Sequence, residues 1–294
     1  MIETLMTALA DWAALLFPFE CMDHAFMRKA MLGLLFLAPL TAGTGIQVVN
    51  SKMAFFSDAI GHSAFAGVAI GILLAMNPSL SMLILALIVG YVIMYMKRSS
   101  KLSTDTIIGV IFAGVVAFGL AIVSRDQNAA KSAQSFLFGD ILTIDDHALF
   151  WLMLLMIVYL IFQYFSFNRM LCIAINPQLS AVHRVKTGWY QYIFAALLSA
   201  TVIVAVRTAG VLLVTALLIV PAAAARNFAK DAAGMFWYTL LFSAFSGAAG
   251  LIISAQQWAR TPAGATIVLV SCVIFCVSAV YASLRGGRTR DSEQ

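Results

Sequence analysis

Long apolar runs separated by short polar segments dominate this chain. Each run is long enough to cross about 30 Å of hydrocarbon as a helix, and the expected spans are residues 30–49, 54–75, 79–96, 106–124, 147–167, 190–208, 210–225, 235–255 and 264–284. The run at 210–225 is short, and we expect it to end near Pro221 because proline interrupts helices. The pattern predicts an all-α, polytopic membrane protein with eight or nine transmembrane helices.

The two ends of the chain differ from these runs. Residues 2–19 have an amphipathic pattern interrupted by Glu3, Asp11 and Pro18, which favours a helix that lies at the membrane interface. We therefore predict an interfacial segment over residues 1–27, a transmembrane domain over residues 28–284 and a basic tail over residues 285–294.

Lysine and arginine predict which side of the membrane each connection occupies. Twelve of the 18 basic residues fall on one side and six on the other, and the richer side is expected to be the cytoplasm. The C-terminal tail is then cytoplasmic and, with nine crossings, the N-terminus is outside. This assignment leaves Arg28 and Lys29 on the disfavoured side.

Composition narrows the class further. The 294 residues are 62% hydrophobic and 11% charged, with a net charge of +5, so no stretch has the composition of a separate soluble domain. The basic residues lie in short loops between spans, which argues against nucleic acid as a partner. The four cysteines are dispersed without a CxxC pair, so neither a thiolate zinc site nor a disulfide framework is implied.

One apolar run contains two residues with metal-binding chemistry. Asp58 and His62 are four residues apart, so on a helix they face the same way. A charged group inside the bilayer costs about 2.5–3.5 kcal/mol and usually faces a partner, a cavity or an ion. Carboxylate and imidazole both bind first-row transition metals. The pair predicts a metal site, and a self-satisfied intrahelical Asp–His pair is the alternative.

Two connections are more than linkers. Residues 132–146 are too apolar for a free loop and too short to cross, which predicts a half-helix or re-entrant segment covered by protein. Residues 168–189 are expected to be cytoplasmic and contain Asn176-Pro177, which starts a helix well. A short docking helix is predicted there, with an ordinary amphipathic loop as the alternative.

Several kinds of chemistry have no motif in this sequence. It has no GxxxxGK[ST] phosphate loop, no HExxH and no GxSxG. Asp58 is the clear intramembrane acid, and His62 is the histidine that lies deep in a span. These observations favour a passive, non-enzymatic transport subunit whose energy comes from another protein.

Four motifs in order resemble the metal-ion ABC permease family, the membrane subunits of zinc, manganese and iron importers. They are residues 52–71 (KMAFFSDAIGHSAFAGVAIG), 135–142 (SFLFGDIL), 210–226 (GVLLVTALLIVPAAAAR) and 261–264 (TPAG). The resemblance implies the helical architecture of a type II ABC importer permease in a bacterial-type cytoplasmic membrane. It also implies that Asp58 and His62 contact the transported metal.

The resemblance further implies partners. These are a second permease copy, two cytoplasmic ABC ATPase subunits and an extracytoplasmic metal-binding protein, with no permanently bound cofactor. Residues 176–187 correspond to the coupling helix that enters a groove of the ATPase, and the expected contacts are Asn176, Pro177, Gln178, Leu179 and Val182.

The sequence departs from the family's pattern at three positions. Ser57 replaces a common glycine, Lys52 stands alone where relatives often have two basic residues, and Arg260 replaces a common acid. Residues 65–71 resemble zinc-type members, so Zn²⁺ is expected before Mn²⁺ or Fe²⁺. The alternatives are a vitamin- or siderophore-type ABC permease, an ion-gradient-driven metal carrier and an intramembrane metalloenzyme.

Overall fold

The computed structural model describes residues 2–16, 19–124, 140–176, 180, 186–256 and 261–291. The described elements are α1 (Ile2–Leu16), η1 (Glu20–Asp23), α2 (Ala25–Asn50), α3 (Phe56–Leu73), α4 (Pro78–Ser99), α5 (Thr104–Val123), η2 (Ile141–Thr143), α7 (Asp146–Ile175), α9 (Thr187–Ala209), α10 (Val211–Phe228), α11 (Ala232–Ala255) and α12 (Ala263–Asp291). Within these residues, nine helices are long and apolar enough to span a membrane. The all-α prediction and the count of eight or nine spans are confirmed.

Polar residues between the apolar runs fix where helices begin. Asn77 accepts a hydrogen bond from the Ser79 amide just before α4, which has Pro78 in its first turn. Ser103 caps α5, and Asp145 and Asp231 cap α7 and α11 in the same way. Each cap satisfies an amide that the helix leaves unpaired. The short polar segments therefore set the helix boundaries.

The helices form an inner group and an outer group. In the inner group, 78% of the span in α2, 67% in α3, 61% in α9 and 56% in α10 is buried within the protein. In α5, α7 and α12 the buried share is 22%, 22% and 17%. The outer helices therefore leave most of their apolar surface free for lipid or a second protein.

Small residues allow the inner helices to approach closely. Gly67 of α3 lies against Met82 of α4, and a Cβ atom on Gly67 would come within 2.7 Å of the Met82 Cα atom. No side chain fits into that space, so the close contact of α3 and α4 depends on glycine.

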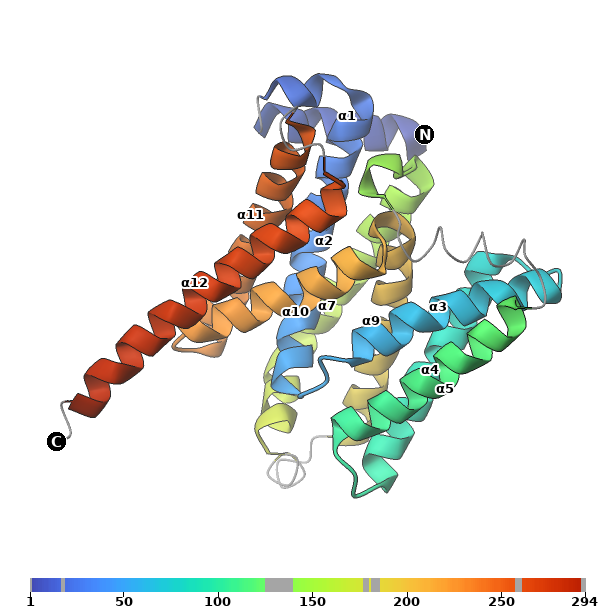
Figure 1. The fold of residues 1–294 in the computed structure, drawn as a ribbon, viewed down its shortest axis with the longest axis vertical. Coiled ribbons are helices and arrows are strands. Elements are labelled where there is room, and N and C mark those ends of the chain that lie inside the picture. Colours follow the sequence, from blue (N-terminus) through green and yellow to red (C-terminus); the bar gives the residue numbers. More distant parts are fainter. Residues whose placement is uncertain are drawn as a thin grey trace.

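Helix α1 lies across the end of the bundle beside the start of α2 (Figure 1). Its Met6 and Ala10 pack against Leu32 of α2 and Leu149 of α7. The amphipathic pattern thus forms a helix, as expected. Its place at a membrane interface stays a prediction.

Two basic residues that the charge rule left on the disfavoured side form ion pairs. Arg28 contacts Asp11 at 2.5 Å, and Lys29 contacts Asp146 at 2.8 Å. Arg28 and Lys29 thus each have a carboxylate partner among the described residues.

Two helix ends differ from the predicted ones. Pro221 lies inside α10, which continues to Phe228, so the expectation that this helix ends near Pro221 was wrong. Proline is tolerated in a membrane helix where neighbouring helices hold the segment, and Ala222, Ala224 and Ala225 are buried against them. Pro39 is likewise inside α2.

Helix α7 extends to Ile175, beyond the predicted end at residue 167. Arg169 lies in this extension, is exposed and donates a hydrogen bond to the Tyr190 hydroxyl at the start of α9. The guanidinium also lies 5.4 Å from the centre of the Tyr190 ring. The helix therefore continues past this cation, which has a partner on the next helix.

Two predicted segments fall largely outside the described residues. Of the proposed re-entrant segment, the structure describes Asp140, η2 and the start of α7, where the Asp140 side chain accepts a hydrogen bond from the Leu142 amide. Of the proposed coupling helix, it describes Asn176, Ser180 and residues from 186 onward. The re-entrant segment and the coupling helix therefore remain predictions.

Candidate metal-binding pocket

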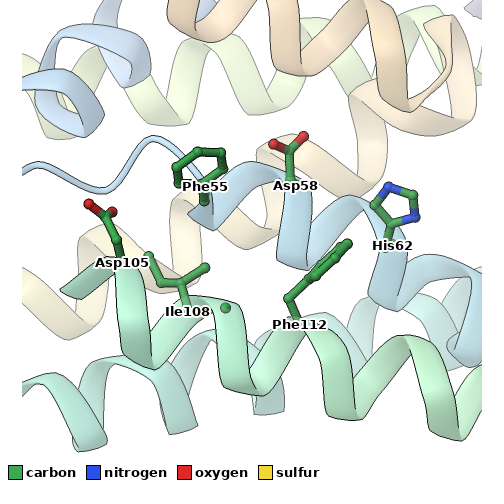
Figure 2. A pocket seen from close by; sticks show the side chains of 7 residues that line it. Phe55, Asp58, His62, Asp105, Ile108 and Phe112 are labelled. Atoms are coloured by element: carbon green, nitrogen blue, oxygen red, sulfur yellow. The ribbon is translucent and has the colours of Figure 1, made fainter. Parts of the chain in front are cut away.

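Asp58 and His62 lie on one face of α3 and point into a cavity of about 560 Å³ (Figure 2). Asp58 is in the first turn of the helix and His62 is one turn further on. Both side chains are half-buried. The pair therefore lies near the N-terminal end of α3 rather than at its middle, and both side chains line the cavity.

Helix α5 forms the opposite wall of the cavity. This wall consists of Asp105, Ile108, Gly109 and Phe112 (Figure 2). Phe55, the residue just before α3, completes the lining of the cavity. The spacing of these α5 residues places them on one face of a helix. Apart from Asp105, this wall is apolar, so Asp58 and His62 face mainly apolar side chains of α5.

The cavity exists because α3 and α5 diverge. Further along the two helices, Gly119 of α5 lies against Ala66 of α3, and a Cβ atom on Gly119 would be 2.9 Å from the Ala66 Cβ. A Cβ atom on Gly109 would have no atom within 4 Å. The pair of helices is thus closed at one end and open at the end that carries Asp58.

An aromatic ring positions the imidazole. The centres of the His62 and Phe112 rings are 5.2 Å apart, and the ring planes meet at 80°. Edge-to-face pairs of this kind contribute about 0.5–1.5 kcal/mol beyond their buried area. Phe112 therefore restricts the orientation of His62 without competing for a metal ion.

A third helix also reaches the carboxylate. Thr215 of α10 lies near the Asp58 carboxylate, and its hydroxyl donates to the Leu212 carbonyl at 3.3 Å. The start of α10 reaches α3 because Val211 packs against Gly61, where a Cβ atom would come within 2.9 Å of the Val211 Cγ1 atom. Gly210, with a φ of 82°, allows the chain to turn sharply from α9 into α10.

Sequence reasoning missed Thr215, Phe112 and Asp105. Thr215 had a usable signal, because it is a hydroxyl residue within the apolar run at 210–226. Phe112 and Asp105 had none, since Phe112 is an aromatic residue in an apolar span and Asp105 falls in the predicted loop before the span at 106–124.

Asp58 and His62 are too few to complete a zinc site by themselves. Zinc is usually held by four ligands, and Asp58 and His62 provide one oxygen and one nitrogen donor. Among the described residues, no three His, Cys, Asp or Glu side chains come together in a way that could hold a metal ion. A metal ion held by this pair would need further ligands beyond these two side chains.

The other predicted site residues belong to the coupling segment. Asn176 is exposed at the end of α7, where its amide donates to the Cys172 carbonyl at 3.1 Å. Pro177, Gln178, Leu179 and Val182 lie outside the described residues. Their contact with an ATPase is a prediction that the structure does not address.

Comparison with known proteins gives consistent matches over most of the chain. The profile of a family described as "ABC 3 transport family" matches residues 23–282. The High-affinity zinc uptake system membrane protein ZnuB of Haemophilus influenzae is 32% identical over 260 residues, which are 88% of this chain and 97% of that protein. The Manganese import system permease protein ScaB of Streptococcus gordonii is 29% identical, over 87% of this chain and 91% of that protein.

A solved structure also matches. The structure of PsaBC from Streptococcus pneumoniae in complex with Fab superposes with a TM-score of 0.74 and 25% identity, over 87% of this chain and 91% of the matched chain. The names of the two relatives describe a membrane protein and a permease of uptake systems, not enzymes.

Proposed function

Because this chain belongs to the ABC 3 transport family, we propose that it is the membrane-spanning permease subunit of an ATP-driven importer of a divalent transition metal ion. The observation that supports this function most directly is the Asp58–His62 pair on α3, which faces a cavity of about 560 Å³. A carboxylate and an imidazole beside a cavity in a membrane span suit a passing cation.

The metal is proposed to be Zn²⁺ first, then Mn²⁺ or Fe²⁺. The matched relatives include a zinc and a manganese system at 32% and 29% identity, so identity alone does not separate the two metals. An oxygen and a nitrogen donor also suit all three ions. The preference for Zn²⁺ rests on the resemblance of residues 65–71 to zinc-type members.

The complete site is proposed to form in a homodimer. A two-fold axis beside the open end of α3 and α5 would bring together two Asp58–His62 pairs, which supplies four ligands. Such a site would bind through one half-site on each chain and could release its ion when the two chains move apart, as transport requires.

The remaining partners follow from the family. Cytoplasmic ABC ATPase subunits would supply the energy, with contacts from residues 176–187. An extracytoplasmic metal-binding protein would deliver the ion to the opposite face. The chain would lie in a bacterial-type cytoplasmic membrane with its C-terminus in the cytoplasm, as the distribution of lysine and arginine predicts.

Metal uptake by the complete importer tests this function. Asp58→Ala and His62→Ala are each expected to lower ATP-dependent uptake by at least about tenfold, since even groups that only support a ligand are worth 10–100-fold in metal affinity. Asp23→Ala and His147→Ala remove the same side-chain types from exposed positions outside the cavity and are expected to leave uptake unchanged.

Uptake that persists in both α3 variants would refute the assignment. Uptake in liposomes without the ATPase, driven by a pH or sodium gradient, would instead identify a gradient-driven carrier. Metal-stimulated ATPase activity, compared across Zn²⁺, Mn²⁺ and Fe²⁺, would identify the substrate.

A further inference from the structure

Asp105 lines the same cavity as Asp58 and His62 but belongs to a different helix. It lies in the first turn of α5 and is exposed. Phe112 of α5 packs on His62 and Gly119 of α5 packs on Ala66, so α3 and α5 run in the same direction. The polar groups therefore follow one another along the cavity in the order Asp105, Asp58 and His62 (Figure 2).

Asp105 is not a third ligand for an ion held by Asp58 and His62. No three metal-binding side chains come together among the described residues, although all three of these line one cavity. An ion at Asp105 would therefore occupy a different position from an ion at the α3 pair. Because Asp105 is exposed and Asp58 and His62 are half-buried, this second position is nearer to water.

A cation on α4 is within electrostatic range of Asp105 but does not form an ion pair with it. Lys97, in the last turn of α4, is half-buried, and its ammonium donates to the Ser51 carbonyl at 3.5 Å. It interacts electrostatically with Asp105, yet the two ion pairs within 4.0 Å in the described part of the chain join other residues. The Lys97 ammonium thus has a long contact to a carbonyl and leaves the Asp105 carboxylate without an ion pair among the described residues.

This arrangement suits a position that an ion occupies only briefly. The Asp105 carboxylate attracts a divalent ion, and the Lys97 ammonium repels it. A site on a conduction path must bind strongly enough for entry and weakly enough for exit. This end is the predicted cytoplasmic side, as indicated by the basic residues Lys52, Lys97, Arg98 and Lys101. An imported ion would therefore pass Asp105 as it leaves the cavity for the cytoplasm.

We propose that Asp105 is a release station for the transported metal ion at the mouth of the cavity, and that Lys97 keeps the ion from remaining there. This inference rests on the proposed function of the Asp58–His62 pair. It adds a second position for the ion, on α5, to the one on α3.

Asp105→Asn in the complete importer tests the proposal, with two quantities measured in parallel. These are ATP-driven uptake of Zn²⁺ or Mn²⁺ into proteoliposomes, and the metal retained per importer after gel filtration without ATP, measured by mass spectrometry. We expect uptake to fall about tenfold, as for loss of a group that supports a metal site, while retained metal stays within about twofold of the parent because the α3 pair is intact. Asp105→Glu keeps the carboxylate and should restore uptake.

Lys97→Met tests the second half of the proposal with an effect of opposite sign. Removal of the ammonium should raise the metal retained at subsaturating concentration by about fivefold, the scale of one charge contact near water. Lys97→Arg keeps the charge and should retain the parent value. Co-purification with the ATPase establishes that each variant is assembled.

Three results would overturn the release station. Asp105→Asn could leave uptake within twofold of the parent, or it could lose uptake and retained metal together, which would make Asp105 a ligand of the α3 ion. Lys97→Met could fail to change retained metal. Failure of the proposed function looks different, since Asp58→Ala and His62→Ala would then leave both uptake and retained metal intact.

Discussion

The two ends of the α3–α5 pair differ in how closely the helices approach, and the same residue type marks both ends. At the closed end, Gly119 allows Ala66 to approach closely, because a Cβ atom on Gly119 would lie only 2.9 Å from the Ala66 Cβ atom. At the open end, a Cβ atom on Gly109 would meet nothing within 4 Å. One glycine brings the helices together and the other leaves space between them.

This difference shows how a cavity arises in a tightly packed membrane protein. The cavity between Asp58 and α5 results from the divergence of two helices, and it needs no unusually small side chain on α3. Its depth depends on the contact at the closed end, which fixes the angle between the helices. A change at Gly119 and a change at Gly109 should therefore act on different properties of the protein.

Gly119→Leu is expected to have the largest effect. The new side chain would collide with Ala66, and overpacking of this kind costs about 1–3 kcal/mol of stability. The midpoint of thermal unfolding of the detergent-solubilised protein should fall accordingly. Gly114→Leu is the matched control, because Gly114 is on the same helix with no atom within 4 Å of its Cβ position. Equal losses in the two variants would contradict the close contact.

The positions of these contacts could not be read from the sequence, whereas the helices could. The apolar runs predicted eight or nine spans, and the structure reproduces the nine expected ranges within a few residues at most ends. Polar residues such as Asn77 and Ser103 cap helices at these boundaries. Both kinds of signal are local, because hydrogen bonds of a helix and its cap join residues close in sequence.

Only the part of the candidate site formed by residues close together in the sequence could be predicted. Asp58 and His62 share a face because they are one turn apart on α3, so their alignment follows from sequence spacing. Thr215 and Phe112 reach the site through the packing of α10 and α5 against α3, which no periodicity in the chain encodes. Pro221 was read as a helix end for the same reason, since the helices packed around it are not visible in the sequence.

Gly109→Leu is expected to have the next largest effect, on transport rather than on stability. The new side chain would enter the cavity opposite Asp58 and His62, and uptake should fall by about tenfold, equivalent to about 1.4 kcal/mol. The thermal midpoint should stay the same or rise, since leucine favours a helix more than glycine does. Gly109→Ala fills less of the cavity and should lower uptake less.

A fall in thermal stability of Gly109→Leu as large as that of Gly119→Leu would show that the open end is packed in the assembled protein. Gly114→Leu again serves as the control, since it adds the same side chain to α5 outside the residues that line the cavity. Uptake by this control should equal that of the parent.

Phe112→Leu is expected to have the smallest effect, confined to metal affinity. Leucine keeps the wall of the cavity apolar but removes the ring whose edge-to-face contact with His62 has a centre-to-centre distance of 5.2 Å. Loss of about 0.5–1.5 kcal/mol would weaken metal retention by about two- to tenfold if the ring holds the imidazole in its binding orientation. Phe118→Leu makes the same change at an exposed position of α5 and should leave retention unchanged. Equal retention in the two variants would mean that Phe112 only fills space, and the orientation of His62 would then depend on α3 alone.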